Sequence, residues 1–174
     1  MNIKRTQVYA ALIFVLTVVS VFILLLYIYY LKDNRITITD INRYQMGDIK
    51  QIQYDIEEVT SDKAGNYYIK GWCILKNVRY GYFNYGNNKT SSNVYNNMHL
   101  CIIDANKVYI LPTKLEKRQD VNEFINDGID YKYCGYRAKL NNNYISLISE
   151  HSWGIILKNI DGEESIYFLA EQSK

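Results

Sequence analysis

The feature that most constrains this chain is an uncharged apolar run near its N-terminus, Val8 to Leu31. At about 1.5 Å per residue, a helix of this run is long enough to cross a hydrocarbon core of about 30 Å with some tilt. Tyr27, Tyr29 and Tyr30 lie at its C-terminal end, and aromatic rings favour the membrane interface. A soluble helix of this length would carry a polar stripe, which this run lacks. The run therefore predicts a transmembrane helix.

A cleaved signal peptide is the main alternative. Its apolar region usually has about 7–15 residues and ends at a small-residue cleavage site. The run here is longer and continues into the polar residues 32–35 without such a site, so we favour an uncleaved signal anchor. Basic residues lie on both sides of it, so the positive-inside bias is slight. The short tail before the helix and the larger domain after it favour a cytoplasmic N-terminus and an external domain.

The sequence thus predicts a cytoplasmic tail at 1–7, a transmembrane signal anchor at 8–31, a linker at 32–47 and an extracytoplasmic domain at 48–174. Of the 20 basic and 18 acidic residues, four and one lie within residues 1–35, which leaves sixteen and seventeen for the rest. The domain therefore has no basic excess, and nucleic-acid binding is not expected. The abundance of Asn, Ile, Lys and Tyr is typical of a low-GC bacterium.

Short segments with strand character fill most of the predicted domain. They are rich in Tyr, Ile and Val, and Asn- or Gly-containing turns separate them. This pattern predicts a mainly β domain, an antiparallel Ig-like β-sandwich of about eight strands. The candidate strands are Ile52 to Ile56, Tyr67 to Leu75, Met98 to Asp104, Val108 to Leu111, Asp130 to Leu140, Tyr144 to Glu150, Trp153 to Lys158 and Ser165 to Ala170.

Arg118 to Asn126 is the one predicted helix, because Val121, Phe124 and Ile125 are three and four residues apart and so share a helical face. A second exception is the segment Asn77 to Asn97, which has no strand period and carries tyrosines among Gly, Asn and Ser. Such a composition is typical of adaptable binding loops. The alternative is an excursion or a hairpin whose tyrosines pack on the sheet.

A series of short motifs follows in order along the chain: Gly71-Trp72-Cys73, Arg118-Gln119-Asp120-Val121 with Phe124, Gly135-Tyr136, Leu140 and Tyr144-Ile145. This series resembles the β-sandwich accessory domains of Gram-positive surface-polysaccharide proteins, which occur beside glycosyltransferases. The resemblance covers about residues 66–150. It implies a β-sandwich and a role in envelope-polysaccharide assembly through a partner or a neighbouring enzyme, since this chain carries no transferase domain. Asn141-Asn142-Asn143 stands where the pattern often has Gly.

Catalytic motifs are missing from the sequence, which has no nucleophile elbow, phosphate-binding loop or zinc-protease helix. His99 and His151 are interpreted as structural, because neither has a recognisable nucleophile partner. The spacing of Cys73, Cys101 and Cys134 matches no zinc motif. Free, buried cysteines are favoured over a Cys73–Cys101 bridge. We expect a non-enzymatic protein with no cofactor and no metal.

Six residues are candidates for ligand binding. Aromatic faces can stack on sugars, and Arg118 with Asp120 could contact a sugar or tie the short helix to the sandwich. The expected function is a membrane-anchored surface module that binds glycan or assists polysaccharide assembly. The alternative is a protein-interaction subunit of a membrane complex, with a membrane-protein partner and no sugar binding. The candidates are Trp72, Tyr80, Tyr82, Tyr85, Arg118 and Asp120.

Overall fold

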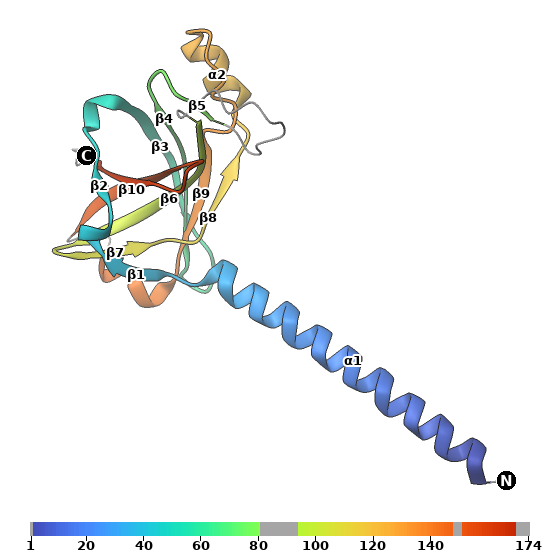
Figure 1. Ribbon diagram of the computed structural model, residues 1–174. Coiled ribbons are helices and arrows are strands. Elements are labelled where there is room, and N and C mark those ends of the chain that lie inside the picture. Colours follow the sequence, from blue (N-terminus) through green and yellow to red (C-terminus); the bar gives the residue numbers. More distant parts are fainter. Residues whose placement is uncertain (1, 81–93, 148–150, 170–174) are drawn as a thin grey trace. The chain divides into compact units, whose positions relative to one another are not determined.

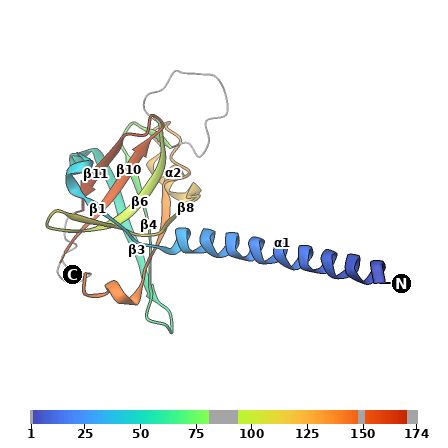
Figure 2. The same ribbon diagram turned by 60° about the horizontal axis from the view of Figure 1, so that its bottom comes forward.

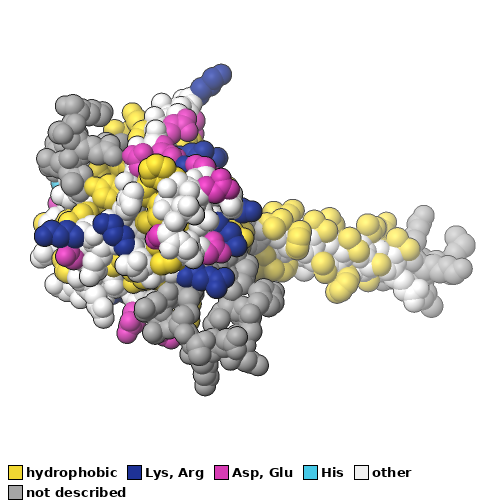
Figure 3. Space-filling model, turned by 90° about the horizontal axis from the view of Figure 1, so that it is seen from above, with side chains coloured by type: hydrophobic (Ala, Val, Ile, Leu, Met, Phe, Trp, Pro, Cys, Tyr) yellow, Lys and Arg dark blue, Asp and Glu magenta, His cyan; other side chains and the backbone are white. Residues whose placement is uncertain are grey.

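The computed structural model describes residues 2–80, 94–147 and 151–169, and the chain divides into two compact units, Met1–Arg35 and Ile36–Lys174. The first unit is one helix, α1 (Asn2–Asn34). Its apolar stretch Gln7–Leu31 has a mean hydropathy of 3.0, and all of its side chains are exposed. Apolar side chains run along the face of the helix visible in Figure 3. A helix of this length and composition could anchor the chain in a membrane.

Two hydroxyl groups inside the apolar stretch are satisfied within the helix. Thr17 Oγ1 donates to the Ile13 carbonyl at 2.9 Å, and Ser20 Oγ donates to the Leu16 carbonyl at 2.8 Å. Such bonds to the preceding turn hide the polar groups of Ser and Thr in an apolar environment. The helix therefore presents an uninterrupted apolar surface despite these two residues.

The second unit is mainly β and has two sheets (Figure 1). Sheet A has the order β1-β7-β6-β10-β11-β2, with β5 paired to β6; β6, β10 and β11 lie side by side in Figure 2. Its strands are β1 (Thr37–Asp40), β2 (Gln45–Met46), β5 (Arg79–Tyr80), β6 (Val94–Asp104), β7 (Lys107–Ile110), β10 (Ser152–Asn159) and β11 (Glu164–Phe168).

Sheet B is antiparallel throughout and has the order β3-β4-β9-β8. Its strands are β3 (Ile52–Ser61), β4 (Tyr67–Leu75), β8 (Thr113–Glu116) and β9 (Gly135–Leu140). Short helical segments connect the strands of the two sheets: η1 (Ile41–Arg43), η2 (Ile49–Gln51), α2 (Gln119–Ile125) and η3 (Asn142–Tyr144).

The two sheets share one hydrophobic core. Met98 and Leu100 from β6, Leu157 from β10, and Ala138 and Leu140 from β9 are all fully buried in the same cluster. Alternate residues of a strand point to opposite faces of its sheet, so the period of two in β9 places Ala138 and Leu140 inward and Arg137 outward. The two sheets confirm the prediction of a mainly β domain.

The other face of sheet A is also covered, by the chain that precedes β3. A second buried cluster joins Cys101, Ile103 and Ile156 to Ile41 and Tyr44. Ile41 begins the short helix η1 between β1 and β2, and Tyr44 follows its last residue. Backbone bonds fasten this segment, because the amide of residue 41 donates to the carbonyl of residue 106 and the amide of residue 47 to that of residue 166, both at 2.9 Å. Sheet A is therefore buried on both faces.

The predicted linker at 32–47 differs from the structure. Residues 32–34 continue α1, and β1, η1 and β2 belong to the second unit. Strand β1 pairs with β7 from Thr37–Ile110 to Asp40–Lys107. The four residues of β1 are held mainly by backbone hydrogen bonds to β7. Because such bonds do not depend on side-chain type, the sequence of β1 shows no alternation of apolar residues.

Other expectations are partly met. Helix α2 confirms the helix predicted at 118–126. The predicted strand Tyr144 to Glu150 is wrong over its described part, where η3 is followed by helical residues. Tyr144 and Leu147 both pack against the core, and their spacing of three suits a helical turn. The expected all-antiparallel pairing is wrong for sheet A, because β11 pairs with β2, and β5 with β6, in parallel.

Candidate functional site

The end of β4 is the starting point of the candidate site. After Leu75 the chain turns, with the Val78 amide donating to the Leu75 carbonyl at 3.1 Å. Asn77 takes a left-handed conformation with φ of 63°. Asn adopts this region more readily than most residues because its short polar side chain bonds locally. The turn leads into β5 and so to the start of the tyrosine-rich segment.

Hydrogen bonds to the Tyr131 side chain fix the position of this turn. The ring is buried, and its hydroxyl accepts from the Asn77 amide at 3.1 Å and donates to Asp127 Oδ2 at 2.8 Å. Burial, with the hydrogen bond to Asp127, raises the pKa of Tyr131 to about 12, so the hydroxyl keeps its proton. The Tyr80 amide adds a bond to the Asp130 carbonyl at 3.2 Å. The turn is therefore anchored before the chain enters residues 81–93.

The second wall of the site is η2. Asp48 caps this short helix, because its side chain accepts from the Lys50 amide at 2.9 Å. Two bonds join η2 to the turn: the Lys76 amide donates to the Gln51 carbonyl at 2.9 Å, and Lys76 Nζ donates to the Lys50 carbonyl at 3.0 Å. These contacts bring together residues that are about 25 positions apart in the chain.

A hollow of about 440 Å³ opens between these two walls, and we call it the hollow below. Four of its lining residues have polar side chains, two lysines and two amides, and the other two, Leu75 and Val78, are apolar. A mixture of donors and small apolar surfaces suits a ligand rich in hydroxyl groups. The lining residues are Lys50, Gln51, Leu75, Lys76, Asn77 and Val78.

The predicted tyrosines relate to the hollow in different ways. Tyr80 is buried, with 3% of its surface exposed, and its ring lies 6.2 Å from that of Tyr95. It therefore packs in the core next to the hollow and offers little surface for stacking. Tyr82 and Tyr85 lie outside the described residues. Trp72 is 9% exposed and also belongs to the core.

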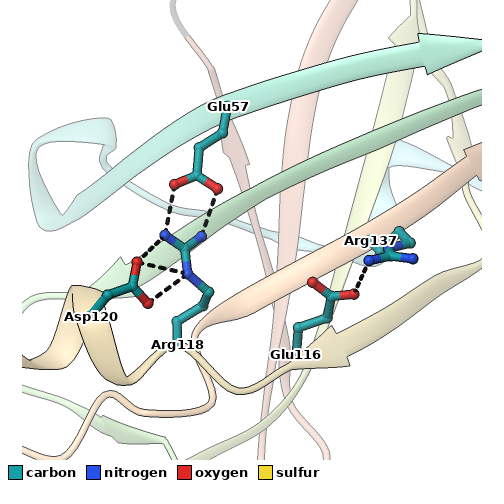
Figure 4. A network of polar contacts seen from close by, with 5 residues as sticks. All are labelled: Glu57, Glu116, Arg118, Asp120 and Arg137. Atoms are coloured by element: carbon teal, nitrogen blue, oxygen red, sulfur yellow. Dashed lines mark hydrogen bonds and ion pairs between the residues drawn. The ribbon is translucent and has the colours of Figure 1, made fainter.

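Arg118 and Asp120, the remaining predicted residues, form an ionic cluster with Glu57 that we call the Arg118 clamp (Figure 4). Arg118 Nη1 and Nη2 donate to the two oxygens of Glu57 at 2.6 and 2.7 Å. Its Nε and Nη2 donate to Asp120 at 2.9 and 2.6 Å. Paired, parallel bonds of this kind are the strongest contacts an arginine makes with carboxylates. All three nitrogens of Arg118 are engaged.

The backbone explains why these side chains meet. Strand β3 has a bulge between Ile56 and Glu58, so that Glu57 has no partner in the register with β4. A bulge re-aims the extra side chain, and here it directs Glu57 to Arg118. Gly135 provides room for the stem of Arg118, because a Cβ at Gly135 would lie 2.5 Å from Arg118 Cγ.

The clamp has an architectural role. It joins β3 to the segment that begins α2, and hydrogen bonds from Arg118 lower the pKa of Asp120 to about 2. The Arg118 side chain is only 13% exposed, so a ligand would have to displace a carboxylate to reach it. Motif residues far apart in the sequence also meet here, since Trp72 pairs with Gly135 and Gly71 with Tyr136. Arg118 and Asp120 were predicted either to contact a sugar or to join the short helix to the β domain. The geometry fits the second role.

The three cysteines are free and buried, as the sequence favoured. Cys73 and Cys134 lie opposite one another, with the Cys73 amide donating to the Cys134 carbonyl at 3.0 Å. Cys101 belongs to the cluster on the other face of sheet A, so it does not share the core of Cys73. Burial raises the pKa of all three thiols. Their thiolate, the reactive form, is therefore scarce at neutral pH.

The histidines are apart from each other and from the hollow's lining. His99 is on β6 opposite Ile156, and burial lowers its pKa. His151 lies 3.8 Å from a carboxylate oxygen of Asp104. Among the described residues, no group of three or more His, Cys, Asp or Glu side chains is placed to hold a metal ion.

Sequence reasoning did not find the hollow. Lys50, Gln51 and Lys76 carry no motif, and only the local Asp48 cap of η2 leaves a trace in the sequence. Comparison of the chain with protein-family models, with curated proteins and with solved structures finds no match in any of the three. The site is therefore interpreted from its own geometry.

Proposed function

We propose that this chain is a membrane-anchored, non-enzymatic surface module that binds glycan at the hollow. In this proposal Gln7–Leu31 is a signal anchor with its N-terminus in the cytoplasm, and the β domain lies outside the cell. The domain would serve the assembly or retention of an envelope polysaccharide. Its two packed sheets, taken with the motif resemblance, support an Ig-like sandwich of the kind that accompanies glycosyltransferases.

The hollow is the observation that carries this proposal. It is open to solvent, it joins side-chain donors to a small apolar surface, and its walls are braced by backbone bonds. Sugars present the matching chemistry, with hydroxyl groups around a ring that has apolar faces. The hollow also includes Asn77 and Val78, the first residues of the tyrosine-rich segment.

A binding titration tests the proposal. The full-length chain in nanodiscs is titrated with purified envelope polysaccharides from a Gram-positive bacterium, and binding is measured by calorimetry and co-sedimentation. Gln51→Trp fills the hollow, and Gln53→Trp is the matched control because Gln53 is exposed on β3 outside it. We expect saturable binding that the first variant weakens by about tenfold and the second leaves unchanged. Binding to no polysaccharide by the folded chain would overturn the proposal.

A protein-interaction role is the second candidate, and the position of β3 favours it. This ten-residue strand is an edge of sheet B, and its second half, from Glu57 to Ser61, is exposed. Exposed edges can accept a strand from a partner, although the bulge at Glu57 and the acidic side chains reduce pairing with a like edge. A photo-crosslinking residue at Val59 tests this role. Capture of one membrane protein without any polysaccharide binding would favour it.

A further inference from the structure

The charge of the hollow differs from that of the domain around it. Residues 36–174 contain one more acidic than basic residue, yet among the described residues the charged ones that line the hollow are two lysines, Lys50 and Lys76. Within the part of the chain that the structure describes, no Asp or Glu lines the hollow. The nearby Asp48 is not one of them, and its side chain is already bonded to the Lys50 amide.

Both ammonium groups remain available to a ligand. Elsewhere in the domain Lys132 and Lys158 are neutralised by Asp130 and Glu164 at 2.8 and 3.0 Å. Within the described part of the chain, the ion pairs include neither Lys50 nor Lys76. Lys76 uses one of its three N–H donors on the Lys50 carbonyl, which positions its charge beside η2 and leaves two donors.

We propose that the hollow selects an acidic glycan, one whose repeating unit carries a carboxylate or a phosphate. The anionic group lies between Lys50 and Lys76, the amides of Gln51 and Asn77 bond to sugar hydroxyls, and the ring rests on the surface of Leu75 and Val78. This inference rests on the proposed glycan binding and narrows its ligand class. Two cations in a partly enclosed site attract an anion more strongly than the same cations on an open surface.

The test uses three dextrans of one chain length, neutral, carboxymethylated and phosphorylated, so that only the charge differs. The full-length chain is held in phosphatidylcholine nanodiscs. We expect one or both of the charged dextrans to bind about tenfold more tightly than the neutral one at low salt, with the advantage falling as salt screens the charges. The comparison between the two charged polymers shows whether carboxylate or phosphate is preferred.

Three double variants assign the effect to the hollow. Lys50→Gln with Lys76→Gln removes both charges and should lower the affinity for the charged dextrans about tenfold, while leaving the weak neutral binding unchanged. Lys50→Arg with Lys76→Arg keeps the charge and should retain binding. Lys107→Gln with Lys114→Gln is the matched control, since both lysines are exposed on strands outside the hollow. This double substitution should leave binding unchanged.

Two outcomes would overturn the inference. Equal binding of the neutral and charged dextrans, or equal losses in the Lys50/Lys76 and Lys107/Lys114 variants, would refute an acidic ligand at the hollow while glycan binding itself still stands. If no dextran and no envelope polysaccharide binds a chain shown to be folded by circular dichroism, glycan binding and its acidic form both fail.

Discussion

Gly135→Ala is the most informative substitution for the Arg118 clamp. A Cβ at this position would lie 2.5 Å from Arg118 Cγ and 3.0 Å from the Glu116 carbonyl oxygen. The first distance is too short, so the arginine stem must move. Its guanidinium is held at 2.6 to 2.9 Å by two carboxylates, so the stem cannot move without disturbing the clamp.

The expected losses in the free energy of unfolding follow from the packing and the exposure of the clamp. Overpacking in a well-packed site costs about 1–3 kcal/mol, and we expect about 2 kcal/mol for Gly135→Ala. Arg118→Ala should cost a similar amount, about 2 kcal/mol. Its bonds are charge-assisted, but Asp120 is 66% exposed, so solvent screens part of their energy.

The two substitutions should not be additive. Once Arg118 is truncated, the shortest contact left to the methyl group at position 135 is the Glu116 carbonyl oxygen at 3.0 Å, and Ala is favoured over Gly in a strand by about 0.5–1 kcal/mol. Gly135→Ala should therefore cost close to nothing in the Arg118→Ala background. The double variant should lose about 2 kcal/mol instead of 4, which is a coupling of about 2 kcal/mol.

Urea unfolding of residues 36–174 measures this coupling free energy. Unfolding is monitored by the fluorescence of Trp72 and Trp153. This fragment contains both hydrophobic clusters of the second unit. Gly128→Ala is the control, because its φ of +87° makes Ala costly there but nothing lies within 4 Å of the added Cβ. Its cost should add to that of Arg118→Ala. Additivity of Gly135→Ala with Arg118→Ala, to within about 0.5 kcal/mol, would refute the argument.

Three further predictions concern single residues. Ala105 has φ of +49°, so Ala105→Gly should stabilise the domain by about 1 kcal/mol in urea unfolding. Burial lowers the pKa of His99, so the neutral imidazole contributes stability that is fully present above its ordinary pKa of about 6.5 and is lost as pH falls through the lower folded pKa. In urea unfolding, wild type should therefore lose more stability than His99→Gln as the pH is lowered from about 7.5 to about 5.5. Tyr131→Phe removes the bonds to Asn77 and Asp127 and should cost about 1–2 kcal/mol; limited proteolysis should cleave residues 76–80 faster than in wild type.

Much of the domain could be predicted because its strands are local patterns. The alternation in β4 and β9 and the turn residues at 62–66 and 161–162 are visible in the sequence, and the structure has hairpins at both turns. The pattern failed where a segment is short or held by backbone bonds alone. Strand β8 follows Pro112 with only four residues, and β1 depends on pairing with β7. Neither strand is long enough to show a period.

The candidate sites divide in the same way. Arg118, Asp120 and Gly135 could be singled out as motif residues, but the sequence did not show that Glu57 completes their cluster, because a bulge in β3 is needed to aim it. The hollow was not predicted at all. Its walls come from η2 and from the turn after β4, which meet only when the end of β4 is paired with the start of β3.

The sequence by itself determined the apolar N-terminal helix, the mainly β class of the domain and the burial of its three cysteines, because each depends on the hydrophobicity or periodicity of neighbouring residues. Only the tertiary structure decided which charges meet. Arg118 is satisfied by carboxylates two and 61 positions away, whereas Lys50 and Lys76 share an open hollow whose described lining residues include no carboxylate. Whether a charged side chain is bonded within the fold or left for a ligand depends on strand register and turns that bring distant residues together, and a linear pattern carries no record of them.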